Sequence, residues 1–208
     1  MRQKIAIAGL KLLQPKEKKL IKFLGKKLVI YPSVFDPRYI FTTKFFAENL
    51  RIKEKKVLEI GTGTGILSII AAKNAKKVLA VDINHFAVKC AQENIKLNKL
   101  TNVDVKKSNL FSNVKEKFDL IIFNPPYLQG KPKKHIEYAW YDNGLLKKFF
   151  EQANDYLSKK GRILVLYSTI ADKKKFERLI KRNDYNFRII ASKYGLFEKF
   201  LIYSICHS

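Results

Sequence analysis

The sequence has few of the residues that bind metals or form disulfides. Among 208 residues there are two cysteines and three histidines. Cys90 and Cys206 lie far apart without redox or metal-ligand spacing, and the histidines are scattered along the chain. A disulfide framework and a zinc site are therefore not expected. The sequence predicts a metal-free protein of the cytoplasm, where thiols stay reduced.

Long apolar runs are also missing. No run approaches the roughly 20 residues that a membrane helix requires. The N-terminus is basic, its apolar runs are interrupted by lysines, and no small-residue cleavage site follows. We therefore expect neither a signal peptide nor a membrane anchor. The apolar fraction of 47% fits a folded protein, and 208 residues suffice for one full domain with a core.

Acidic residues are scarce. Asp and Glu number 18 against 42 Lys and Arg, which gives a formal net charge of +24. Such a surface attracts polyanions, and phosphate contacts supply most of the non-specific affinity for nucleic acids. A lysine-rich coat can also simply be a solvated surface, in a chain whose composition resembles that of an AT-rich genome. The charge favours a nucleic-acid partner over that plainer interpretation.

What the chain does have is an alternation of apolar strands and amphipathic helices from residue 55 onward. This pattern predicts an α/β fold with a mainly parallel sheet and helices on both faces. The last two strands, 187–193 and 200–205, are joined by a short turn and are expected to pair antiparallel at the sheet edge. Gly161 is expected to end the helix that precedes the strand at 163–168.

A glycine-rich turn, VLEIGTGTG, follows the first strand of this alternation. Gly61, Gly63 and Gly65 permit a tight turn, a close backbone approach to a ligand, and packing of the next helix. Their spacing fits neither a phosphate loop nor the dinucleotide pattern. Together with Glu59, the turn can instead hold the ammonium and carboxylate groups of a methionine.

The next strand ends at Asp82, where a carboxylate can accept hydrogen bonds from both hydroxyls of an unphosphorylated ribose. A surface aspartate that begins the next helix is the alternative. With the glycine turn, Asp82 resembles the S-adenosylmethionine-binding half of a class I methyltransferase. In many such enzymes an acidic residue after the third strand binds the adenine amino group, and here Asn109 occupies that place. The expected cofactor-binding residues are Thr43, Glu59, Gly61, Thr62, Gly63, Gly65, Asp82, Ile83, Asn109, Leu110 and Asn124.

The apolar strand FDLIIF ends abruptly in NPPY. The side-chain oxygen of Asn124 and the carbonyl of Pro125 can accept the two hydrogens of a planar NH2 group, which turns the nitrogen lone pair toward a sulfonium methyl. Pro126 adds a rigid wall, and Tyr127 offers a ring face for stacking. A turn that merely ends the strand is the alternative. The motif predicts direct methyl transfer in which alignment and electrostatics carry the catalysis.

With VLEIGTGTG, NPPY makes the chain from about Tyr31 onward resemble the HemK/PrmC-like class of S-adenosylmethionine-dependent N-methyltransferases. These enzymes methylate the side-chain amide of glutamine in translation release factors. The same tetrapeptide serves methyltransferases of the exocyclic amino group of adenine or guanine. The resemblance implies a Rossmann-like class I methyltransferase fold, with a mainly parallel seven-stranded sheet whose C-terminal strand is antiparallel.

The resemblance also implies a division of the chain. Residues 1–50 would form a basic N-terminal segment with a helix that covers the cofactor, and residues 51–208 the catalytic domain. Within the first segment, a helix is expected over 15–25, because its apolar residues fit one face. The covering helix is expected to begin at Thr42 or Thr43, whose hydroxyls suit an N-cap.

Three functions remain open. The main hypothesis is methylation of a nucleobase amino group in RNA, because a basic and aromatic cluster follows the motif where the HemK/PrmC-like class carries a glycine-rich loop. The alternative is a glutamine amide in a release factor or ribosomal protein. A non-catalytic binding subunit is the third, and a small activating subunit is a further possible partner. The expected substrate-binding residues are Tyr127, Lys131, Lys133, Lys134 and Trp140.

Overall fold

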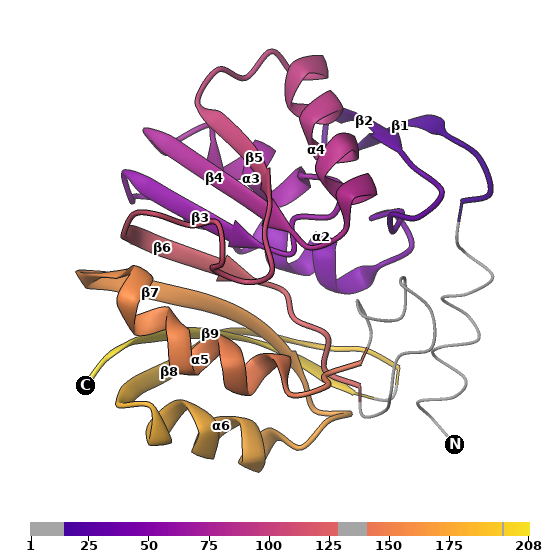
Figure 1. The fold of residues 1–208 in the computed structure, drawn as a ribbon. Coiled ribbons are helices and arrows are strands. Elements are labelled where there is room, and N and C mark those ends of the chain that lie inside the picture. The colour runs from indigo at the N-terminus through magenta and orange to yellow at the C-terminus, as the bar shows by residue number, and fades with distance from the viewer. Residues whose placement is uncertain (1–14, 129–140, 197) are drawn as a thin grey trace.

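The structure is a computed structural model that describes residues 15–128, 141–196 and 198–208. Seven of its strands form one sheet in the order β5-β4-β3-β6-β7-β9-β8 (Figure 1). Neighbouring strands are parallel except that β9 runs antiparallel to both β7 and β8. The elements are β1 Lys19–Phe23, β2 Lys26–Ile30, α2 Phe41–Glu48, β3 Lys56–Ile60, α3 Ile66–Ala71, β4 Lys77–Asp82, α4 His85–Leu97, β5 Val103–Lys107, β6 Phe118–Phe123, α5 Leu145–Tyr156, β7 Leu157–Ser168, α6 Lys173–Arg182, β8 Tyr185–Tyr194 and β9 Lys199–His207.

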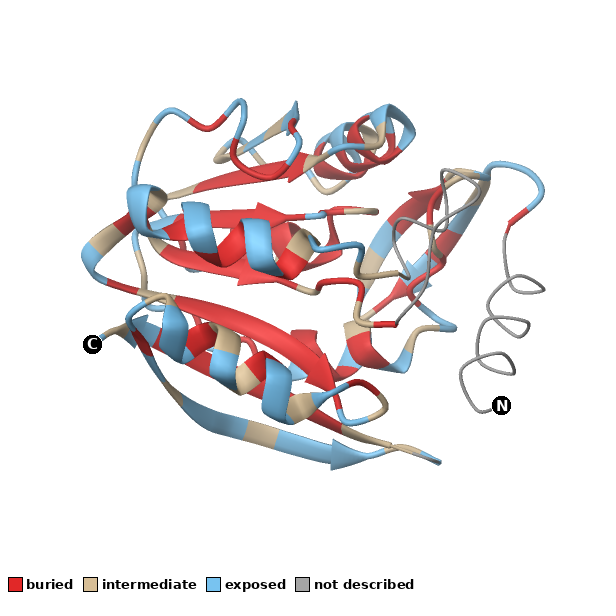
Figure 2. Ribbon diagram, turned by 60° about the horizontal axis from the view of Figure 1, so that its bottom comes forward, coloured by how far each residue is buried: buried red, intermediate tan, exposed pale blue. Residues whose placement is uncertain are grey.

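The core lies on both faces of this sheet. In β6, Ile121 and Phe123 pack into a cluster with α5 and α6, whereas Leu120 and Ile122 pack into a second cluster with α2, α3 and α4. Side chains of a strand alternate between faces, so a strand covered on both sides is apolar throughout. Figure 2 shows the central strands buried, while the edge strand β8 is mostly exposed. The predicted mainly parallel seven-stranded sheet with an antiparallel C-terminal strand is confirmed.

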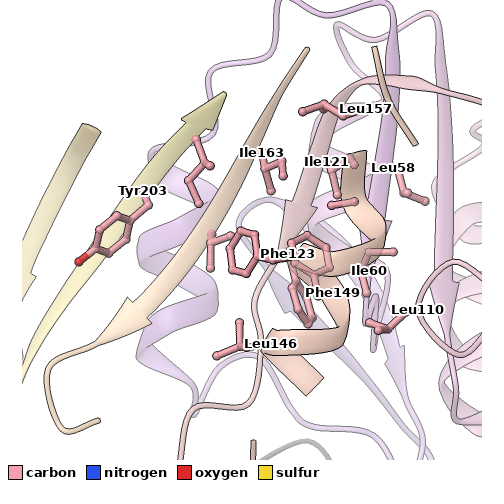
Figure 3. Packing of buried hydrophobic residues seen from close by; sticks show 14 of the residues in the cluster. Leu58, Ile60, Leu110, Ile121, Phe123, Leu146, Phe149, Leu157, Ile163 and Tyr203 are labelled. Carbon is pink, nitrogen blue, oxygen red and sulfur yellow. The ribbon is translucent and has the colours of Figure 1, made fainter. Parts of the chain in front are cut away.

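Aromatic rings fill the cluster beneath α5. In Figure 3, Phe149 of α5 lies against Phe123 of β6, with ring centroids 4.6 Å apart. Phe149 also stacks on Phe111, at 5.5 Å between centroids. These rings anchor the residue immediately before Asn124, so the end of β6 is held on a rigid support.

The helix predicted over residues 15–25 is wrong, because β1 and β2 form an antiparallel hairpin there. Leu24 and Gly25 have positive φ angles of 48° and 75°, as a two-residue turn between twisted strands requires. Ile21 is 7% exposed and its neighbour Leu20 is 63% exposed. Burial therefore follows the two-residue period of a strand, which the apolar composition alone did not reveal.

Two predicted helix ends also differ from the structure. The residue before α2 is Ile40, which makes no side-chain cap, so Thr42 and Thr43 lie inside the helix and neither is its N-cap. Helix α5 passes directly into β7, so Gly161 is a strand residue and not a helix cap. Leu157, the first residue of β7, is already buried and paired with β6, which ends the helix before the glycine is reached.

The described part of the N-terminal segment packs on the sheet. Phe46 of α2 is fully buried in the cluster that contains one face of β6. Asn94 of α4 accepts the N–H of Val29 in β2 at 2.6 Å and donates to the Val29 carbonyl at 2.9 Å. The division of the chain after residue 50 stays a prediction. None of the helices in the described ranges has the length and apolar character that crossing a membrane would take.

Candidate functional site

A cavity of about 460 Å³ opens at the carboxyl edge of the parallel strands. Open α/β sheets bind their ligands at this edge. A second hollow, of about 730 Å³, lies at the opposite edge, is rich in lysine and contains none of the predicted site residues. The predicted residues that line the first cavity are Thr43, Glu59, Gly61, Thr62, Gly63, Asp82, Ile83, Asn109, Leu110, Asn124, Pro125, Pro126 and Tyr127.

The glycine turn has two parts with different surroundings. Gly63 has a φ of 56° and lines the cavity, and a Cβ there would meet nothing within 4 Å. Gly65 has a φ of 80°, and a Cβ there would lie 3.1 Å from the Cβ of Ala91 in α4. Gly65 is not part of the cavity wall, so its expected contact with the cofactor stays a prediction. In the structure, Gly65 instead allows the start of α3 to lie close to α4.

Glu59 is buried beside this turn. Its Oε2 accepts the Thr62 hydroxyl at 2.7 Å and the Ser68 N–H at 3.0 Å, and the Ser68 hydroxyl donates to the same oxygen. Burial outweighs these bonds and raises the pKa of Glu59 to about 7, with the charge of Asp82 acting in the same direction. A cation bound in the cavity would favour the ionised form.

Asp82 joins the end of β4 to the neighbouring turns. Its Oδ2 accepts the Gly63 N–H and its Oδ1 accepts the Asn84 N–H, each at 2.9 Å. Burial raises the pKa of Asp82 although the bonds from Gly63 and Asn84 oppose the shift. A carboxylate has about four acceptor positions. Two bonds therefore leave acceptor capacity for the two hydroxyls of a ribose.

Two of the remaining predicted cofactor residues lie at the exposed rim of the cavity, whereas Thr62 and Leu110 are buried in its wall. Asn109 is exposed after β5, and Ile83 is 53% exposed after β4. The cavity thus offers open space beside Gly63, an acceptor at Asp82 and an amide near the end of β5. These features fit S-adenosylmethionine, which supplies an electrophilic sulfonium methyl group when it is bound.

The NPPY residues form the cavity wall beside this region. Pro125 is buried, and the Tyr127 ring meets Tyr167 edge-on with centroids 6.2 Å apart. Burial raises the pKa of Tyr127 and the charge of Glu198 adds to the shift, so this phenol stays neutral. Among the described residues the Asn124 amide has no hydrogen-bond partner. Its oxygen is therefore available to a planar NH2 group.

Four of the five predicted substrate residues lie outside the described residues, namely Lys131, Lys133, Lys134 and Trp140. The described residues on either side of this stretch, Leu128 and Tyr141, form an isolated parallel bridge and both line the cavity.

Sequence reasoning missed two charged residues of the cavity wall, Lys148 of α5 and Glu198. Glu198, between β8 and β9, lines the cavity with Tyr127. A lone acidic residue in the hairpin of a chain with only 18 acidic residues was an available signal. It went unused because the contact depends on how the last two strands pack against β7.

Comparisons with known proteins agree with this geometry. The methyltransferase small domain family matches residues 27–203. A Methanocaldococcus jannaschii protein, provisionally named a protein N5-glutamine methyltransferase, is 38% identical over 194 residues, which cover 88% of this chain and 96% of that one. The release factor glutamine methyltransferase of Streptococcus pneumoniae is 34% identical over 159 residues, or 68% of this chain and 56% of that one. A tRNA methyltransferase structure from M. jannaschii has a TM-score of 0.68 at 23% identity, covering 93% of this chain and 58% of that one.

The structural likeness shows the Rossmann-like class I fold. The sequence matches extend over most of this chain and confirm the resemblance to the HemK/PrmC-like class. The chain belongs to the methyltransferase small domain family and is an S-adenosylmethionine-dependent N-methyltransferase.

Proposed function

We propose that the acceptor of this methyltransferase is the side-chain amide nitrogen of a glutamine in a translation protein, with a release factor as the first candidate. The observation that carries the proposal is the 38% identity to a provisionally named protein N5-glutamine methyltransferase along almost the whole of both chains. The tRNA methyltransferase shares only 23% identity, which is evidence for the fold alone. Relative to the sequence analysis, this reverses the order of the two substrate hypotheses without removing either. Since the proposed acceptor belongs to translation, the proposed place of action is the cytoplasm.

In this proposal the NPPY residues hold the acceptor. The Asn124 side-chain oxygen and the Pro125 carbonyl accept the two amide hydrogens, and Tyr127 stacks on the plane of the amide. The two hydrogen bonds draw the nitrogen lone pair out of conjugation and toward the methyl group. The new bond is N–C, the bond that breaks is S–C, and the proton leaves the nitrogen for solvent after transfer. Alignment and electrostatics supply the rate enhancement.

The cofactor side of the cavity is assigned by the same reasoning. We assign Glu59 and the glycine turn to the amino-acid group, Asp82 to the ribose and Asn109 to the adenine. Thr43, Thr62, Ile83 and Leu110 complete the proposed contacts, since they line the same cavity.

A nucleobase amino group in RNA is the second candidate. The observation that favours it is the net charge of +24, which suits a polyanion. An exocyclic amino group offers the same two hydrogens to Asn124 and Pro125. Lys131, Lys133, Lys134 and Trp140 are the predicted contacts to such a substrate, and the target base would have to be unpaired or flipped.

One labelling experiment separates the two. The protein is incubated with methyl-labelled cofactor and either purified release factor or total RNA from the same source, and each product is then treated with nuclease or protease. Label that survives nuclease, is lost to protease and maps to a glutamine supports the proposal. Label that is lost to nuclease instead identifies RNA as the acceptor and overturns it.

A further inference from the structure

Glu198 lies on the opposite side of Asn124 from Asp82, the expected ribose-binding residue. In the sheet order, β4 with Asp82 is two strands from β6, and β9, which Glu198 precedes, is two strands from β6 in the other direction. Neighbouring strands are about 5 Å apart, so each residue stands roughly 10 Å to one side of the motif. The cavity wall contains both. Glu198 therefore lies on the side of Asn124 away from the proposed ribose site, and we take this as the acceptor side.

The Glu198 carboxylate has an incomplete set of partners. The hydroxyl of Ser168, a fully buried residue at the end of β7, donates to Oε2 of Glu198. The Ser168 oxygen in turn accepts the N–H of Ile170 at 3.1 Å, which fixes the direction of the hydroxyl. Within the described parts of the chain, Oε1 of Glu198 has no hydrogen-bond partner. One carboxylate oxygen is thus positioned and the other is available.

Like Glu59 and Asp82 of the same cavity, Glu198 is a sheltered carboxylate that has no cation partner among the described residues. Glu54 and Asp36 are also sheltered, and each is paired with an arginine, at 2.6 and 2.7 Å. Among the described residues, no lysine or arginine pairs with Glu198, although the sequence contains 42 of them. Burial raises the pKa of Glu198 despite the Ser168 bond. Burying an unpaired carboxylate destabilises the fold. We therefore expect the Glu198 carboxylate to have a function besides packing.

We infer that Glu198 is a substrate-binding residue that accepts a hydrogen bond from a backbone N–H of the polypeptide beside the target glutamine. The inference rests on the proposed function. A polypeptide that enters the cavity loses water from its own N–H groups, and each needs an acceptor. Pro125 and Pro126 contribute carbonyls alone, and Asn124 with Pro125 is already assigned to the side-chain amide. Glu198 supplies the further acceptor on the acceptor side.

A purely structural role predicts something different. A hydrogen bond that only holds the β8–β9 turn against β7 needs an oxygen that accepts the Ser168 hydroxyl. A glutamine side chain supplies that oxygen. The negative charge and the second carboxylate oxygen matter only to a group that enters the cavity. Replacement of Glu198 by glutamine therefore separates the two roles.

The test uses the full chain, purified release factor and labelled cofactor. We expect Glu198→Gln to raise the KM for release factor about tenfold or more, since hydrogen bonds to charged groups are strong, with kcat within about threefold. Glu198→Ala should raise KM further. The cofactor affinity of Glu198→Gln, measured by calorimetry, should match that of the wild type, and its melting temperature should be equal or higher because the unpaired charge is removed.

The matched control is Glu177→Gln. Glu177 in α6 also accepts a hydroxyl, that of Tyr203 at 3.1 Å, and does not line the cavity. Its KM should stay within about twofold of the wild type. An unchanged KM in Glu198→Gln, or an equal rise in the control, overturns the role of Glu198. Failure of the wild-type protein to label release factor overturns the proposed function instead, and that result is seen before any variant is compared.

Discussion

Asp82 and Gly63 are joined by a 2.9 Å hydrogen bond from the glycine N–H to the carboxylate Oδ2. The bond ties the end of β4 to the glycine turn after β3, while the other carboxylate oxygen accepts the N–H of Asn84 at the start of α4. One side chain therefore shapes the turn and, in our proposal, binds the ribose. Loss of this carboxylate should damage cofactor binding in both ways.

We predict that Asp82→Ala weakens S-adenosylmethionine binding by about 10- to 100-fold, the range typical of lost hydrogen bonds to a charged group. Asp82→Asn keeps one acceptor oxygen and should lose less. Calorimetry with the cofactor measures both, and Asp104→Ala, at an exposed position of the neighbouring strand β5, is the control. If the cofactor affinity of Asp82→Ala were within twofold of that of the wild type, the assignment of Asp82 to the ribose would be refuted.

Asn124 is the residue whose loss should separate binding from chemistry. We predict that Asn124→Ala lowers the methylation rate by at least about 100-fold, because an acceptor that aligns the reacting nitrogen is removed. Cofactor affinity should stay within a few-fold. Single-turnover labelling and calorimetry measure the two effects.

The control for this prediction is Asn183→Ala. Asn183 follows α6, where its amide donates to the Leu179 carbonyl at 2.9 Å, and it lies outside the cavity wall. Its methylation rate should be that of the wild type. Normal turnover in Asn124→Ala would refute the role given to the NPPY asparagine.

The sequence predicted the parts of the site that short stretches of chain determine. The run FDLIIF is apolar throughout because both faces of β6 are covered, and its end places Asn124 at the edge where ligands bind. The glycine turn lies between β3 and α3 for the same local reason. Such local patterns indicate both the type of an element and the residue at which it ends.

The parts that escaped prediction depend on distant contacts. Leu24 has a positive φ in the β1–β2 turn, a conformation that no sequence rule assigns to leucine. Glu198 reaches the cavity only because β9 inserts between β7 and β8. Gly161 resembled a helix cap, although Leu157 pairs with Phe118 of β6 and starts the strand earlier. Strand order and register decided each of these outcomes.

Glu59 should make cofactor binding depend on pH. Burial raises its pKa to about 7, so the carboxyl is mostly neutral at pH 6 and mostly ionised at pH 8. If the ionised form holds the methionine ammonium, affinity is present above pH 7 and is lost as the pH falls through that value. We expect the Kd for S-adenosylmethionine to rise about tenfold from pH 8 to pH 6.

Glu59→Gln is the variant that isolates this effect. Burial also raises the pKa of Asp82, so the wild-type profile contains a second contribution of the same sign. In Glu59→Gln the weaker affinity should vary little between pH 7 and pH 8, as calorimetry at both values would show. A slope in that interval as steep as that of the wild type would assign the pH dependence to another group.

Gly63 and Gly65 make a matched pair with opposite expected effects. We predict that Gly65→Ala lowers the free energy of unfolding by about 2–4 kcal/mol, because the positive φ strains the alanine and its Cβ meets the backbone of α4. The near contacts are the Cβ of Ala91 at 3.1 Å and its Cα at 3.3 Å. Gly63→Ala meets no atom within 4 Å and should cost about 1 kcal/mol of backbone strain.

The two variants should rank in the opposite order when cofactor affinity is measured instead of stability. The methyl group of Gly63→Ala occupies open space at the wall of the cavity and should reduce S-adenosylmethionine binding more than Gly65→Ala does in its folded fraction. Urea denaturation and calorimetry measure the two quantities. Addition of Ala91→Gly to Gly65→Ala removes the clashing methyl group and should recover part of the lost stability. The separate assignments of the two glycines would be wrong if Gly63→Ala were the less stable variant and Gly65→Ala the weaker binder. In that case neither the close contact with α4 nor the open space at the cavity would determine the effect of the substitution.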